Sequence, residues 1–211
     1  MNKKIFSILL AVVLTASYAQ AQFHVGMNVG VNATSVNGNA VPVFSEDAKI
    51  ESRVGFQAGI VCEYELGKYF AIQSGLLYAT QGYIASMETE NNNEKLEVDF
   101  ALNYLQIPIK AVGKLRLGSS ANLFLQAGPY LGYALNGKMV VEENKQDIEF
   151  GSDDGALKRF DFGVGLGLGF QAGAVQFDME YKLGLQNLSG SSNFDLKNNG
   201  LTISVSYFFG K

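Results

Sequence analysis

The sequence predicts an all-β fold, an eight-stranded antiparallel up-and-down transmembrane β-barrel. Apolar residues recur at every second position through eight segments, which is the period of an extended strand. The positions between them carry many glycines and several charged side chains. Short and long connections alternate between the segments, a rhythm typical of barrels that span a membrane.

The N-terminal segment, residues 1–21, has the features of an export signal. Lys3 and Lys4 precede an apolar run at 5–13, and Ala19 and Ala21 form a small-x-small cleavage site. The apolar run is too short for a spanning helix, which needs about 20 apolar residues. We therefore expect a signal peptide at 1–21 and a barrel domain at 22–211.

Each predicted strand has one apolar face. In the sixth, Phe162, Val164 and Leu166 alternate with glycines, and the last strand alternates apolar residues with Ser and Thr. Pro108 lacks a backbone N–H, so a bulge or a local irregularity is expected in the fourth. The predicted strands are residues 23–31, 53–66, 69–85, 99–114, 123–133, 160–171, 176–186 and 201–209.

The connections divide into two classes. Those after the second, fourth and sixth strands are short, whereas the others are long, at about 32–52, 86–98, 137–157 and 189–199. Short turns on one side, long loops on the other and an even number of strands predict both termini in the periplasm and the long loops outside.

The charged face of the strands decides which way the barrel faces. Consecutive charged positions would be very costly in a dry apolar core, but they can pair inside a narrow polar barrel. The glycines at 163, 165, 167 and 169 share that face, where the interior of an eight-stranded barrel has little room. The large apolar side chains are then expected to face lipid. The alternative is a soluble lipocalin-type barrel with its aromatics inside, but the chain lacks the tryptophan that marks a lipocalin's first strand.

Five segments carry distinctive motifs: NYLQIPI (103–109), QAGPYLGY (126–133), FDFGVGLGLG (160–169) and YKLGLQN (181–187), with GLLY (75–78) in the third strand. In this order along the chain, they resemble the small porin-like family of bacterial outer-membrane β-barrels. The resemblance covers essentially the whole mature chain. It implies an eight-stranded barrel in the outer membrane of a Gram-negative bacterium, and it implies no catalytic residues and no cofactor.

Six charged residues are predicted to share the lumen: Glu63, Glu65, Lys110, Asp178, Glu180 and Lys182. They could form the selectivity ring of a pore. They could equally form a salt-bridged plug, because side chains fill the interior of a barrel of eight strands. We favour the plug.

The remaining candidate sites have weaker support. His24 opens the first strand without a Ser or acid spaced as a catalytic partner, and Cys62 is expected to be a small apolar residue of the outer face. Acidic residues gather in two long loops, where they could hold divalent cations that bridge to lipopolysaccharide, although no calcium-loop spacing is present. They are Glu88, Glu90, Glu94, Glu97, Asp99, Glu142, Glu143, Asp147, Glu149, Asp153 and Asp154. No metal site and no catalytic site is predicted.

The expected function is a structural or surface-interaction role in the outer membrane, exerted through the acidic loops. A narrow porin is the alternative, and a lipid-modifying enzyme is a more distant one. The expected partners are outer-membrane lipid, lipopolysaccharide and the barrel-insertion machinery, which would read Tyr207 and Phe209, although Gly210 and Lys211 depart from the usual aromatic terminus. A net charge of −4 argues against nucleic acid, and we expect a monomer.

Overall fold

The computed structural model describes residues 22–38, 49–88, 95–118, 121–141, 144–148, 150–151, 157–190 and 195–211. Nine strands lie in these ranges, all paired antiparallel. They are β1 (Phe23–Asn37), β2 (Lys49–Glu65), β3 (Phe70–Glu88), β4 (Lys95–Leu117), β5 (Ala121–Val141), β6 (Asn144–Asp147), β7 (Phe160–Ala172), β8 (Val175–Gly184) and β9 (Lys197–Phe208). Across these ranges the structure contains no helix with the length and hydropathy needed to span a membrane.

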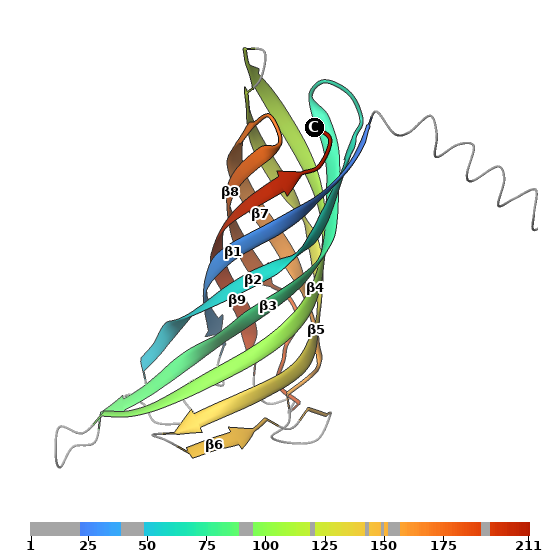
Figure 1. The fold of residues 1–211 in the computed structure, drawn as a ribbon. Helices are drawn as coiled ribbons and strands as arrows, with labels where there is room; N and C mark the ends of the chain where they lie inside the picture. Colours follow the sequence, from blue (N-terminus) through green and yellow to red (C-terminus); the bar gives the residue numbers. More distant parts are fainter. Residues whose placement is uncertain are drawn as a thin grey trace, which may run out of the picture.

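Eight of the strands close into a ring, which confirms the predicted fold class. The order β4-β3-β2-β1-β9-β8-β7-β5 is completed by pairing between β4 and β5, and β1 pairs with β9 along most of its length. β6 lies outside the ring and pairs only with the end of β5. The result is a tilted barrel with the C-terminus and the short turns at one end (Figure 1). We call this the turn end, and the opposite end the loop end.

The strands extend further toward the loop end than the alternation predicts. β4 has 23 residues and β5 has 21, so both continue beyond the part of the barrel that needs to cross a bilayer. β6, within the third long connection, was not predicted. Its four residues NKQD are all polar and exposed, so they carry no alternating pattern.

Pro108 interrupts pairing without shifting it. The ladder between β3 and β4 keeps one register on both sides of Ile107 and Pro108, and Ser74 Oγ donates to the Pro108 carbonyl at 2.8 Å. The expected irregularity is therefore present, but it is not a bulge. The register shift of β4 against β5 lies instead between Asn103 and Tyr104.

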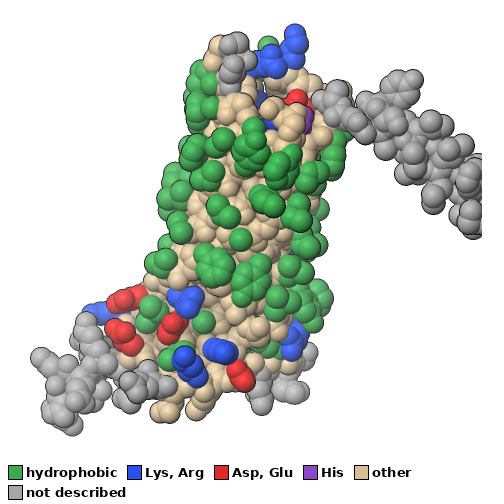
Figure 2. All heavy atoms as spheres, in the orientation of Figure 1, with side chains coloured by type: hydrophobic (Ala, Val, Ile, Leu, Met, Phe, Trp, Pro, Cys, Tyr) green, Lys and Arg blue, Asp and Glu red, His purple; other side chains and the backbone are tan. Residues whose placement is uncertain are grey.

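Large apolar side chains face outward from every ring strand. Val29 is 59% exposed, Leu166 67% and Ile203 54%. Figure 2 shows these side chains as a band across the visible face of the barrel, with charged side chains gathered near its two ends. Along β5, the ten residue steps from Leu123 to Tyr133 span roughly 25 Å at ordinary strand rise and tilt, the height of an outer-membrane apolar band. This exposure contradicts the lipocalin alternative, which would place the apolar side chains inside.

The inner face is polar, and the glycines of β7 make room for its larger side chains. A Cβ on Gly163 would lie 2.8 Å from the Tyr130 hydroxyl, and one on Gly167 would lie 2.9 Å from Gln126 Nε2. The buried polar residues come from every ring strand: Asn28, Asn32, Thr34, Gln57, Glu63, Gln73, Gln81, Ser86, Gln106, Lys114, Gln126, Asp161, Gln171, Gln176, Asp178, Glu180, Lys182, Asn198, Thr202, Ser204 and Ser206.

Candidate functional site in the barrel lumen

Two lysines and two glutamates close the turn end of the lumen. Glu63 is fully buried and accepts hydrogen bonds from Lys114 Nζ at 2.7 Å and from Gln73 Nε2 at 2.6 Å. Lys211 also contacts Glu63, and both lysines lie 3.1 Å from Glu65. Formal charges cancel among these four ionised groups, which we call the turn-end cluster (Glu63, Glu65, Lys114 and Lys211).

Neither lysine of the turn-end cluster was among the predicted site residues. The sequence predicts no partner for Lys211, which stands out there only because it follows the aromatic residue that usually ends such a chain. In the structure, Gly210 has φ +74°, and the chain places the Lys211 ammonium against the two carboxylates and 5.2 Å from the ring centre of Phe208. The signal available in the sequence was the pair of inward glutamates at the end of the second strand, which required cations near that end.

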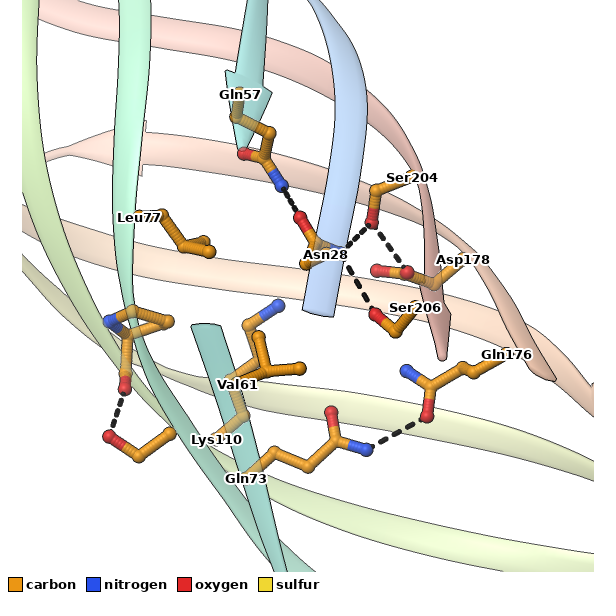
Figure 3. A pocket seen from close by; sticks show the side chains of 12 residues that line it. Asn28, Gln57, Val61, Gln73, Leu77, Lys110, Gln176, Asp178, Ser204 and Ser206 are labelled. Carbon is orange, nitrogen blue, oxygen red and sulfur yellow. Dashed lines mark hydrogen bonds between the residues drawn. The ribbon is translucent and has the colours of Figure 1, made fainter. Parts of the chain in front are cut away.

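A hydrogen-bonded network crosses the middle of the lumen. Asn28 Nδ2 donates to the hydroxyls of Ser204 and Ser206, each at 2.9 Å, and Asn28 Oδ1 accepts from Gln57 Nε2 at 2.8 Å. Ser204 then donates to Asp178 Oδ2 at 2.7 Å. Figure 3 shows these side chains converging from several strands. The network links β1, β2, β8 and β9 through short side chains that leave little space between them.

The six predicted lumen residues do not form one ring. Glu63 and Glu65 belong to the turn-end cluster. Lys110 pairs with Glu180 at 2.9 Å, and Asp178 accepts from Gln126 as well as from Ser204. The ammonium of Lys182, whose side chain is buried, donates to amide oxygens: to Gln106 at 2.9 Å and to Gln57 at 3.4 Å.

The mid-lumen space is small. One cavity beside Asn28 and Asp178 has a volume of about 20 Å³, and another beside Tyr130 and Lys182 has about 10 Å³. A buried water needs roughly 10–15 Å³ measured in this way, so each cavity has room for about one water. The larger one is drawn in Figure 3.

Apolar side chains fill the lumen at the loop end, which the sequence did not predict. Tyr83 and Phe100 stack with ring centres 4.5 Å apart. Leu188 and Leu196, from the connection between β8 and β9, lie buried against the inward residues of the strands. We call this group the loop-end apolar cluster: Val36, Tyr83, Ala85, Val98, Phe100, Leu188 and Leu196. It lies beyond buried Asp161, which is 3.4 Å from both Asn198 Nδ2 and the Tyr130 hydroxyl.

The other candidate residues do not assemble a chemical site. His24 lies opposite Glu63 in the β1–β2 register, and half-buried Cys62 is a free thiol in β2. Among the described residues, no three or more His, Cys, Asp or Glu side chains are grouped to hold a metal. Of the acidic loop residues, the structure describes the side chains of Glu97, Asp99 and Asp147; the side chains of the others lie outside what it describes. Asp99 pairs with Arg53 Nε at 2.7 Å.

A closed eight-stranded ring with a polar lumen and an apolar outer band defines an integral outer-membrane β-barrel protein. The profile of the Outer membrane protein beta-barrel domain family matches residues 18–190, and the chain belongs to that family. It is therefore a protein of the outer membrane. The search of curated protein sequences found no match.

The chain is similar to several solved outer-membrane proteins at low sequence identity. OprG of Pseudomonas aeruginosa is 10% identical, with a TM-score of 0.51, over 90% of this chain and 96% of that one. Neisserial surface protein A is 13% identical, with a TM-score of 0.48, over 87% and 96%. Ail, the attachment invasion locus protein of Yersinia pestis, is 15% identical, with a TM-score of 0.43, over 89% and 99%. The similarity to OprG supports the fold alone and says nothing about a shared activity.

Proposed function

We propose that the protein is a non-conducting, monomeric barrel with a structural or surface-interaction role and no catalytic activity. One observation carries the proposal: the lumen is filled at three levels. Ion pairs close the turn end, a side-chain network fills the middle, and the loop-end apolar cluster fills the opposite end. A hydrated pore needs a continuous path past polar groups, and neither the buried apolar cluster nor cavities of one water provide it.

Purified wild-type protein should therefore give no stable open level in planar lipid bilayers. Its folded state is checked by the shift in gel migration on heating. The double variant Lys110→Gln/Glu180→Gln removes both partners of the mid-lumen pair, so neither is left charged opposite a neutral one. It should also show no conductance. The proposal would be wrong if the wild type gave stable conductance steps and the double variant changed their ion selectivity. The protein would then be a narrow porin.

Lipopolysaccharide is the partner that we propose for the loop end. Arg159 lies 4.7 Å from the ring centre of Phe150, and its Nη1 donates to the backbone carbonyls of Ala134 and Leu135 at 3.0 and 3.3 Å. Together with Lys158 it borders a cavity of about 390 Å³. The exposed ring of Phe160 continues that cavity toward the lipid-facing surface. Two cations beside the lipid-facing ring of Phe160 suit an amphiphile that carries both phosphate and acyl chains.

The double variant Lys158→Gln/Arg159→Gln should bind lipopolysaccharide at least about tenfold more weakly, because it loses charge-assisted contacts to phosphate. Binding is measured by titration of the refolded protein in detergent. Lys145→Gln, an exposed lysine of β6 that does not border the cavity, is the matched control and should bind as the wild type does. Equal affinity of all three proteins would assign lipopolysaccharide contact, if any, to another part of the surface.

A further inference from the structure

The outer wall of the barrel carries an apolar groove near the turn end. It crosses β3, β4, β5 and β7 and has a volume of about 490 Å³. Most of the side chains along it are lipid-facing: Tyr69, Phe70, Leu115, Leu123, Leu125 and Leu168.

Gly113 creates the recess. It takes an outward position on β4 where Ile107, Ile109 and Leu115 carry large side chains in the same phase. Its cross-strand neighbours are Phe70 on β3 and Leu125 on β5. A Cβ added to Gly113 would meet nothing within 4 Å, so the position is open space between two large side chains.

Two exposed cations of the turn end are sequence neighbours of residues that line the groove. Lys68 lies in the turn directly before Tyr69, and Arg116 directly follows Leu115. Tyr69 is 57% exposed, and an exposed tyrosine beside cations is typical of the level where a lipid headgroup meets hydrocarbon. An apolar recess that ends beside cations matches a ligand with a long acyl chain and an anionic head.

We propose that this groove holds one acyl chain of a phospholipid, with the headgroup phosphate beside Lys68 and Arg116. The short turns meet the periplasmic side of the membrane, so the lipid belongs to that leaflet. A second copy of the chain is the less suitable occupant. In a two-fold interface the same surface patch comes from both copies, so the cations of both patches would be brought together.

The test is native mass spectrometry of the refolded protein, released from vesicles of phosphatidylethanolamine and phosphatidylglycerol. Wild type should retain one phospholipid, and Gly113→Leu should retain at least about fivefold less because the new side chain fills the recess. The variant should fold normally, since the added atoms enter open space. Ile109→Phe enlarges a lipid-facing side chain of the same strand outside the groove and should retain lipid as the wild type does.

The headgroup part of the proposal has its own variant. Lys68→Gln/Arg116→Gln should retain less phosphatidylglycerol than the wild type while keeping the groove. Equal retention by wild type and Gly113→Leu would overturn the proposal. So would a wild-type dimer that Gly113→Leu converts to monomer, because the groove would then be an interface between copies. None of these results depends on whether the lumen conducts.

Discussion

Replacing Glu63 with glutamine should lower the free energy of unfolding by about 3 kcal/mol or more. Glu63 is fully buried and is the carboxylate that both Lys114 and Lys211 contact. Glutamine keeps the shape and can still accept from Gln73, but it removes the negative charge. The Lys114 side chain, only 5% exposed, then faces Glu65 alone. Urea unfolding in vesicles, followed by gel migration with and without heating, measures the change.

Glu65→Gln is the matched control because it removes a carboxylate from the same two lysines. Its side chain is 31% exposed, so solvent screens the lost charge and the expected effect is below about 1 kcal/mol. The double variant Glu63→Gln/Lys114→Gln should recover part of the loss, since neither partner is then left charged opposite a neutral one. Equal effects of Glu63→Gln and Glu65→Gln would contradict the assignment of Glu63 as the centre of the cluster.

The barrel could be predicted from the sequence because alternate residues of each strand face lipid and the lumen, and the two sets differ in polarity within a single strand. In β7, Phe162, Val164 and Leu166 face outward and the glycines between them face the crowded lumen, as the alternation indicates. This signal weakens toward the loop end. There Val98 and Phe100 face inward, so apolar side chains no longer mark the lipid-facing side. The extra length of β4 and the apolar filling of the lumen were therefore missed.

The pairing of lumen charges could not be predicted for a different reason. Lys114 meets Glu63 across 51 residues of sequence, and Lys110 meets Glu180 across 70. Which inward side chains share a level depends on the stagger of all strands around the closed ring. Alternation shows whether a residue faces lipid or the lumen, but not its position along the barrel axis. Alternation therefore puts Lys110, Asp178, Glu180 and Lys182 on the inward face, but it does not show which inward side chain each of them contacts.

In an irregular region of the barrel wall, close packing restricts which residue β3 can carry at position 82. The register of β2 against β3 shifts between Ser52 and Gln57. Beside this shift, Thr34 Oγ1 of β1 accepts from the backbone N–H of Gly82 and donates to its carbonyl, both at 2.9 Å. Gly82 has φ +148°, and a Cβ there would collide with the carbonyl oxygen of Phe100 on β4. Backbone conformation and packing both require glycine at this position.

Gly82→Ala should therefore destabilise the barrel by about 2–6 kcal/mol, because backbone strain and steric overlap each cost about 1–3 kcal/mol. The fraction that refolds into vesicles and the urea midpoint should both fall. Gly67→Ala is the control, since Gly67 has φ +142° but nothing lies within 4 Å of its added Cβ. It carries only the strain and should cost about 1–2 kcal/mol. If both variants lost the same stability, the contact between Gly82 and β4 would have to be loose enough to admit a methyl group. The closely packed wall inferred for this region would then be wrong.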